Sequence, residues 1–230
     1  MKQGLYIFSF LFITMGVSAC FDEPDYSDVP FITGIDDFYF VDVASGADSL
    51  IIRVSFQDGD GDLGLSNNEI DPELALQFTF PPGPNGEKYY IFDGTNPDLV
   101  PYDCRRYQYF ETIGQDTIRD TVMVDYNPYY YNFEVIWYTK VDNEYKEFDF
   151  RSELCRSPLA GRFPYLKKDF SNTKPLEGTI KFSIPSIVFK PQFRNDSLKF
   201  GVIIRDRAKH ESNVVESPPF TLEGITRAVD

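Results

Sequence analysis

Apolar and polar residues alternate along several short stretches of the chain, and the two clearest stretches lie far apart. In segments 49–56 and 197–205 every second residue is apolar, and both begin with Ser-Leu directly after an aspartate. A period of two places one side of a strand in the core and the other in solvent. Both segments are therefore predicted to be half-buried strands. Each strand leads into an aspartate eight residues after its leucine, Asp58 in the first case and Asp206 in the second.

Weaker strand patterns fill much of the remaining chain, and long amphipathic helical patterns are missing. The segment 81–86, Pro-Pro-Gly-Pro-Asn-Gly, predicts a turn because proline and glycine interrupt a strand ladder. The segment 155–175 is irregular and predicts a short helix or a long loop. The other predicted strands are 38–43, 75–80, 88–92, 107–112, 118–125, 131–140, 144–150, 178–189 and 214–222.

This succession of short strands predicts an all-β fold, and we expect an immunoglobulin-like antiparallel β-sandwich. The second and sixth strands of such a sandwich run in the same direction. If 49–56 and 197–205 take those places, the loops that follow them meet at one end. The stretch 64–128 is too long for the simplest version of the fold, so inserted hairpins are expected in the middle of the chain.

The N-terminus carries a separate signal. An apolar run, 5–17, ends in Val-Ser-Ala and Cys20, which resembles a bacterial lipobox, the site where a cysteine is lipidated and becomes the new N-terminus. The alternative is a transmembrane helix, but the run falls short of the roughly 20 residues that a span needs. The pair Asp22 and Glu23 resembles the signal that sends Bacteroidota lipoproteins to the outer face of the outer membrane.

These signals divide the chain into three parts. Residues 1–19 are expected to be a lipoprotein signal peptide, and 20–34 a lipidated, flexible tether, because acidic and proline-containing segments bury little apolar surface. Residues 35–230 are expected to form a single β-sandwich domain. Several acyl chains on Cys20 would anchor it stably in the outer membrane, facing the exterior.

The amino-acid composition excludes some classes of binding partner and indicates a pairing of the cysteines. The formal net charge is −14, which argues against nucleic acid and anionic membrane surfaces, since both are bound through basic patches. Lipidation of Cys20 would leave Cys104 and Cys155 as a pair, and the compartment beyond the inner membrane permits a disulfide. The alternative is two free buried thiols.

The acidic loop after the first clear strand is the motif that most clearly indicates a ligand-binding site. Asp58, Asp60 and Asp62 alternate with glycines, so three carboxylates can fold around one hard cation. The spacing is similar to an EF-hand loop, with Glu69 at its twelfth position. However, Leu63 stands where that loop requires glycine, and a strand precedes the loop.

We therefore favour a weak structural calcium site between strands over an EF-hand. Asp206 would approach from the neighbouring loop as a fourth ligand, and no catalytic cofactor is expected. The alternative is a solvated turn, since aspartate and glycine are common turn residues.

Three parts of the sequence together resemble a family: the leader, the run 48–64 and the late run 206–213. They are similar to uncharacterised Bacteroidota surface-exposed outer-membrane lipoproteins with immunoglobulin-like folds. The resemblance implies a lipid-anchored protein of the outer membrane, and it supplies no catalytic residues.

Few residues of the sequence are suited to form a catalytic site. The single histidine, His210, lies in a charged loop, so a Ser-His-Asp or Cys-His arrangement could rest on this residue alone. Zinc sites built from several histidines are excluded by count. A glycosidase-type carboxylate pair stays open because the chain has 36 acidic residues, although no spacing indicates one. We expect a protein that is not an enzyme.

A binding role is the stronger expectation. Aromatic residues cluster in 126–131 and at Trp137 and Tyr138, although Trp137 is better placed for the core. The first hypothesis is a protein-interaction module, an accessory subunit of an outer-membrane protein complex. The alternative is a glycan-binding lipoprotein that assists polysaccharide capture. A groove lined by exposed aromatics would favour glycan, and a contiguous apolar patch would favour a protein partner.

Overall fold

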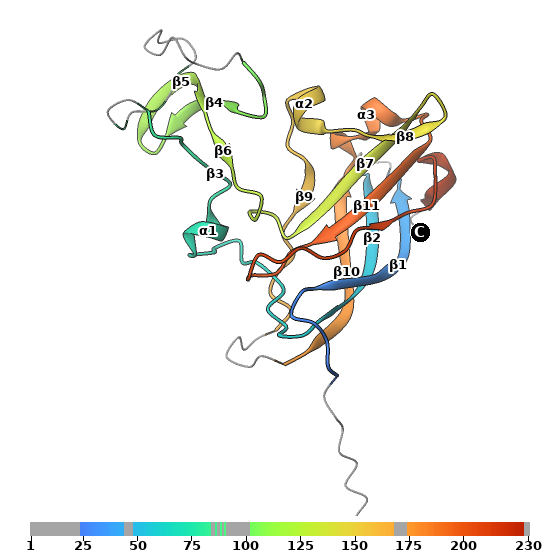
Figure 1. The fold of residues 1–230 in the computed structure, drawn as a ribbon. Helices are drawn as coiled ribbons and strands as arrows, with labels where there is room; N and C mark the ends of the chain where they lie inside the picture. Colours follow the sequence, from blue (N-terminus) through green and yellow to red (C-terminus); the bar gives the residue numbers. More distant parts are fainter. Residues whose placement is uncertain are drawn as a thin grey trace, which may run out of the picture.

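The fold is a two-layer sandwich of antiparallel sheets (Figure 1), so the predicted all-β class is confirmed. The computed structural model describes residues 24–43, 48–83, 86, 88, 90, 102–167 and 174–227. The leader, Cys20 and part of the predicted strand 88–92 lie outside these residues.

The first sheet holds the first clear strand of the sequence. Its order is β10 (Leu176–Pro185), β2 (Ser49–Asp58), β1 (Phe31–Val41) and β13 (Thr226–Arg227). The pairs β1–β2 and β2–β10 are antiparallel, whereas β13 runs parallel to the end of β1.

The second sheet holds the other clear strand. Its order is β12 (Val215–Glu216), β11 (Leu198–Ile204), β7 (Phe133–Val141) and β8 (Glu144–Glu147), and β9 (Leu159–Gly161) also pairs with β7. In chain order β2 is the second strand of the two sheets, and β11 is the sixth when the three-residue strand β9 is left out, so the predicted places agree for the longer strands. Because the order within both sheets follows the immunoglobulin pattern, the loops after β2 and β11 share one end.

The core forms where the two clear strands face each other. The inward residues Leu50, Ile52, Val54 and Phe56 of β2 are at most 3% exposed, and their counterparts on β11 are fully buried. Trp137 on β7 is 1% exposed, so its predicted place in the core is confirmed. Burying one such side chain stabilises the fold by roughly 1.5–3 kcal/mol, which makes this face the main source of stability.

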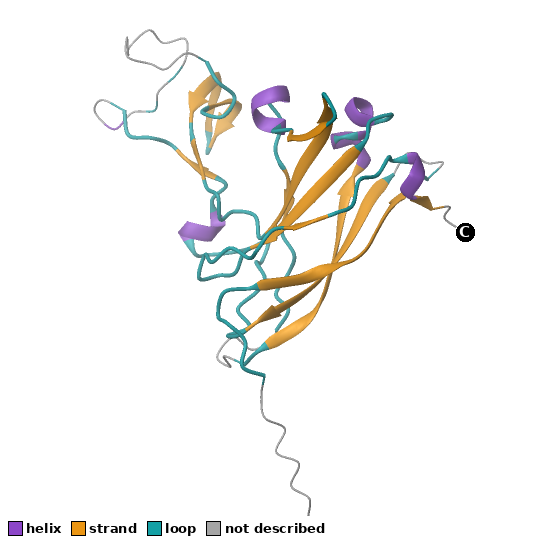
Figure 2. Ribbon diagram, turned by 45° about the vertical axis from the view of Figure 1, so that its right-hand side comes forward, coloured by secondary structure: helices purple, strands orange, loops and turns teal. Residues whose placement is uncertain are grey.

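The described residues within 65–131 form an excursion from the sandwich, which we call the inserted arm. It leaves after β2, returns before β7 and projects to one side of both sheets (Figures 1 and 2). The arm contains a β4–β5 hairpin and a short β3–β6 pair, so the predicted inserted hairpins are confirmed. Its elements are α1 (Pro72–Ala75), β3 (Phe78–Thr79), β4 (Tyr107–Ile113), β5 (Asp116–Met123) and β6 (Asp125–Tyr126).

Short helices lie next to several strand ends (Figure 2). They are α2 (Phe150–Leu154), η2 (Ser186–Val188), α3 (Lys190–Phe193) and η3 (Glu223–Ile225). Two of them correct predicted strands. The strand predicted over 144–150 ends at Glu147 because Asp149 caps α2, and the strand predicted over 178–189 ends at Pro185, where η2 begins.

The first strand is longer than predicted, which also corrects the tether. β1 starts at Phe31, not at residue 38, because register shifts after Ile32 and Ile35 break the alternation that a sequence pattern detects. The last residues of the expected tether, 31–34, therefore belong to a sheet. The strand predicted over 75–80 is reduced to β3, because α1 occupies its start.

The residues before β1 are also attached to the sandwich. The amide of Gly59 donates to the carbonyl of Ser27 at 2.8 Å, and the hydroxyl of Tyr26 donates to Glu177 at 2.5 Å. A Cβ on residue 59 would lie 2.4 Å from the carbonyl oxygen of Tyr26, so this contact requires glycine.

Candidate functional site

Asp58 is a carboxylate at a core position. The inward face of β2 runs through alternate residues, and Asp58 is the next residue in that series after Phe56. It is 0% exposed, and within the described part of the chain neither carboxylate oxygen meets full hydrogen-bond geometry, although the nearby amide of Asp62 lowers its pKa. A buried carboxylate without a positively charged partner is strongly unfavourable, so this position calls for a compensating charge.

Asp206 occupies the equivalent place after β11. It continues the inward series of that strand after Ile204 and is 2% exposed. Since β2 and β11 run in the same direction in the two facing sheets, their terminal aspartates meet. Asp58, Asp62 and Asp206 each offer a carboxylate oxygen, and these oxygens all lie within 4.8 Å of one another. We call these three residues the acidic cluster.

The fourth predicted ligand is placed differently. The carboxylate of Asp60 is not part of the acidic cluster, and its Oδ1 accepts the amide of Asp62 at 3.2 Å. Asp62 is positioned from the β11 side, because it accepts the amide of Ala208 at 3.1 Å. The structure thus brings together three of the four predicted residues, and Asp60 shapes the loop that carries one of them.

Electrostatics within the acidic cluster oppose full ionisation. Burial and the neighbouring carboxylates raise the pKa of Asp58 to about 7 and that of Asp62 to about 6. Burial also raises the pKa of Asp206, although His210 acts in the opposite direction. A divalent cation in the cluster would reverse these shifts, because it stabilises the charged form of each carboxylate.

His210 lies at the edge of the cluster. Its Nδ1 is 2.8 Å from Oδ2 of Asp206, and its amide donates to Oδ1 of the same carboxylate at 2.7 Å. The hydrogen bond to Asp206 raises the pKa of His210. The sequence placed this histidine in a charged loop, and the structure shows that it orients one residue of the acidic cluster.

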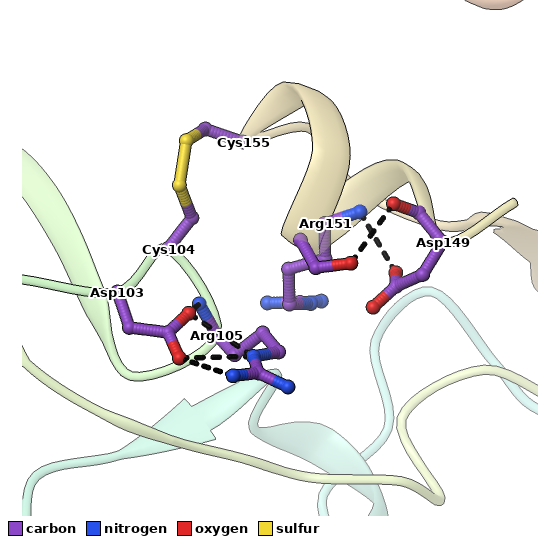
Figure 3. The surroundings of a disulfide bond; sticks show 7 residues. Asp103, Cys104, Arg105, Asp149, Arg151 and Cys155 are labelled. Carbon is purple, nitrogen blue, oxygen red and sulfur yellow. Dashed lines mark hydrogen bonds and ion pairs between the residues drawn. A yellow bond between two sulfur atoms is a disulfide. The ribbon is translucent and has the colours of Figure 1, made fainter.

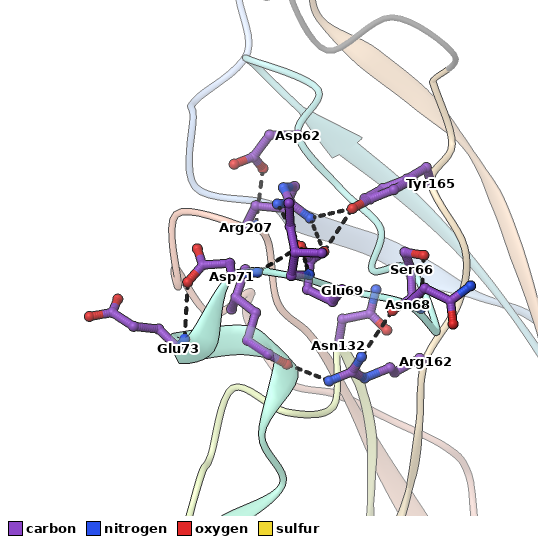
Figure 4. Close-up of polar contacts among 12 residues, drawn as sticks. Asp62, Ser66, Asn68, Glu69, Asp71, Glu73, Asn132, Arg162, Tyr165 and Arg207 are labelled. Carbon is purple, nitrogen blue, oxygen red and sulfur yellow. Dashed lines mark hydrogen bonds and ion pairs between the residues drawn. The ribbon is translucent and has the colours of Figure 1, made fainter.

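Glu69 has a different role from the one that EF-hand spacing would give it. It accepts a hydrogen bond from Arg207 at 2.5 Å and another from Tyr165 at 2.7 Å (Figure 4). The guanidinium of Arg207 is the main reason that the pKa of Glu69 falls to about 2. Glu69 therefore forms an ion pair that fixes the arm to the loop after β11, and the EF-hand interpretation is wrong.

Arg162 is a functional residue that the sequence did not reveal. It donates to the carbonyl oxygens of Tyr130 at 2.7 Å and of Ser66 at 2.9 Å, and also to that of Leu74 (Figure 4). These acceptors belong to both ends of the inserted arm. Because they are backbone atoms, no residue type marks them in the sequence.

A disulfide joins the arm to the sandwich at a second point. Cys104 and Cys155 are bonded, with their Cα atoms 5.1 Å apart, so the predicted pair is confirmed (Figure 3). Cys155 follows α2, and Cys104 immediately precedes the β4–β5 hairpin. Lipidation of Cys20 stays a prediction because that residue lies outside the described part of the chain.

A cleft of about 360 Å³ lies beside the disulfide, between the arm and α2. We call it the tyrosine cleft. Tyrosine rings, glutamine amides and two arginines line it, with a second cleft adjoining it through Gln77, Tyr126 and Arg151. Its volume lies in the range of small-molecule sites. The main lining side chains are Tyr102, Tyr107, Tyr109, Tyr126, Arg151 and Arg156.

Comparisons of the chain with protein-family models, curated proteins and solved structures find no match. None of the helices in the described ranges is long and apolar enough to cross a membrane. What the molecule does is therefore inferred from its own geometry.

Proposed function

We propose that the chain is a non-catalytic, lipid-anchored protein of the cell surface that acts as a protein-interaction module. The observation that carries this proposal is the inserted arm. The sandwich core is complete without the arm, yet the arm is fixed by the disulfide, by Arg162 and by the ion pair of Glu69. A projection that is attached to the sandwich at several points is suited to display contact residues.

The arm carries exposed apolar side chains that a partner could cover. Ile70 is 91% exposed, Leu76 is 50% exposed, and Tyr102 and Tyr109 are each more than half exposed. Large apolar and aromatic residues of this kind supply much of the binding energy of protein interfaces. Together with the lipobox, they support an accessory subunit of an outer-membrane protein complex.

Pull-down of the full-length lipidated protein from outer membranes tests this proposal. We expect the wild type to retain a specific membrane protein that an Ile70→Ser, Tyr109→Ala double variant loses. Ile187→Ser is the matched control, because Ile187 is 77% exposed but lies on η2, away from the arm. Equal retention by the wild type and the double variant would contradict the role of the arm.

We also propose that the acidic cluster binds a structural calcium ion that links the loops after β2 and β11. The support is Asp58, which is buried, faces two further carboxylates and has no positively charged partner among the described residues. Carboxylate oxygens are the ligands that calcium prefers, and waters can complete its coordination. The ion would offset the repulsion within the cluster.

The calcium proposal predicts a higher melting temperature for the full-length protein when calcium replaces a chelator. Asp206→Asn should abolish this increase, because it removes one of the three clustered carboxylates. Asp60→Asn is the comparison variant and should keep more of the increase than Asp206→Asn, since the Asp60 carboxylate is outside the cluster and acts on it only through its charge. A wild-type melting temperature that does not respond to calcium would rule out the site.

The tyrosine cleft supports a second function, the capture of glycan. Exposed tyrosine rings offer flat surfaces for sugars, and the glutamines beside them offer hydrogen bonds. Binding of soluble oligosaccharides to the full-length protein in detergent tests this function. Tyr102→Ala should weaken binding, whereas Tyr39→Ala on β1, outside the cleft, should not.

A further inference from the structure

The tyrosine cleft has a charge that contrasts with the rest of the molecule. The chain carries a formal net charge of −14, yet the described residues that line this cleft include Arg151 and Arg156 and no acidic residue. The negative net charge of the protein repels anions at long range. The arginines of the cleft attract an anion only at short range. Such a cleft would select an anion by shape and hydrogen bonding.

Arg151 is held in place by an aromatic ring. Its guanidinium carbon lies 3.4 Å from the ring centroid of Tyr126, and it is half-buried on α2. Asp149 accepts the backbone amide of Arg151, while the guanidinium extends towards the segment that carries Cys104 (Figure 3). Arg151 also forms a side-chain hydrogen bond with Tyr126, and a guanidinium has five N–H donors, so others remain for a planar carboxylate.

Arg151 also lines the adjoining cleft, which contains Glu134, Glu147 and Asp149, whereas Asp103 beside Cys104 forms an ion pair with Arg105. Glu134 forms an ion pair with Arg205 at 2.7 Å, and Asp149 caps α2. On the other side, Arg156 follows the disulfide and adds a second positive charge to the tyrosine cleft. An anionic group is thus favoured between the two arginines of the tyrosine cleft.

The opposite wall offers ring surfaces. Tyr102 is 56% exposed and stacks on Tyr107, with 6.0 Å between ring centroids, and Tyr109 is 57% exposed. Tyrosine rings with exposed surfaces can contact the apolar face of a sugar ring. The cleft therefore combines a surface for a ring with a site for a carboxylate.

We propose that the tyrosine cleft binds an acidic sugar, a glycan unit whose ring carries a carboxylate. The carboxylate is held by Arg151 and Arg156, and the ring lies against the exposed tyrosines. This inference rests on the glycan-binding function proposed above, and it adds the charge class of the glycan.

The test compares two probes by calorimetry on the full-length protein in detergent. One probe is an oligosaccharide of galacturonic acid, and the other is the neutral galactose oligosaccharide of equal length. We expect the acidic probe to bind at least about tenfold more tightly, which is the effect of one hydrogen-bonded charge pair. Arg151→Gln with Arg156→Gln should abolish this preference.

Two further variants distinguish the effect of the positive charge in the cleft from the effect of the planar shape of the guanidinium. Arg194→Gln removes an exposed positive charge outside the cleft, next to α3, and should leave the preference unchanged. Arg151→Lys keeps the charge but loses the planar fork, so it should bind the acidic probe several-fold more weakly than the wild type. Melting curves of each variant show whether it is folded.

The outcomes distinguish this inference from the function on which it rests. Equal binding of acidic and neutral probes would overturn the charge preference and leave glycan binding standing. Binding of neither probe would overturn both. Equally tight binding of polyglutamate, which has carboxylates but no sugar ring, would overturn the assignment to sugars.

Discussion

Asp58 and Asp206 illustrate what single residues contribute to this molecule. Both occupy positions that the strand period assigns to the core, and both are aspartates instead of apolar residues. This placement could be predicted, because the alternation that identifies the strands extends to them. A carboxylate at a core position reduces stability unless a ligand compensates it, so such residues indicate function.

Removing the charge of Asp58 should therefore stabilise the protein when calcium is absent. Asp58→Asn keeps the shape but eliminates a buried carboxylate whose pKa burial and the neighbouring carboxylates raise to about 7. In a chelator at pH 7 we expect the free energy of unfolding to rise by on the order of 3 kcal/mol. Denaturant unfolding measures the change, and a lower value for the variant would show that Asp58 is compensated within the protein.

The ion pair of Glu69 and Arg207 predicts a pH dependence. The pKa of Glu69 falls to about 2 in the folded protein from 4.5, so its contribution to stability is present above pH 4.5 and is lost as the pH falls towards 2. Because the Glu69 side chain is 3% exposed, the contribution is on the order of 3 kcal/mol.

Glu69→Gln should lose this contribution at pH 7 and should show a flatter fall in stability between pH 4.5 and pH 2. Glu144→Gln on the exposed β8 strand is the control. Unfolding curves at successive pH values measure both variants, and parallel curves for the wild type and Glu69→Gln would contradict the pairing. This ion pair joins residues 138 positions apart, so no local pattern could reveal it.

At the scale of elements, sequence patterns identified the regular strands and failed at the irregular ones. β2 and β11 alternate without interruption, so their faces and most of their extent could be predicted. β1 contains two register shifts that disrupt the alternation, and β3, β6 and β12 are too short to show a period. Pairing across long insertions, which positions these short strands, depends on contacts that a local pattern does not contain.

The disulfide predicts that the β4–β5 hairpin depends on its attachment to α2. Replacing Cys104 and Cys155 by serine opens a loop with a sequence separation of 51, which costs about 4 kcal/mol in the chain-entropy model. We expect faster hydrogen exchange in β4 and β5, with little change in β2 and β11, because the core lies in the sandwich. Unchanged exchange in the hairpin would mean that other contacts hold the arm.

At the scale of the whole molecule, the arm and the sandwich are joined through Arg162. Arg162→Ala removes three hydrogen bonds to carbonyl oxygens at both ends of the arm. We expect a loss of about 3 kcal/mol in the free energy of unfolding. Arg194→Ala, at an exposed position next to α3, is the control. If the free energy of unfolding falls by a similar, small amount in Arg162→Ala and in Arg194→Ala, the arm is held without Arg162.

The attachment of Ser27 to Gly59 has a mechanical consequence. This contact lies directly beside Asp58, whereas Thr226 pairs with Phe40 at the far end of β1. A pulling force between Ser27 and Thr226 is therefore applied along β1, and it first reaches the loop of the acidic cluster. We expect calcium to raise the rupture force measured on single molecules, because the ion would join the loops after β2 and β11.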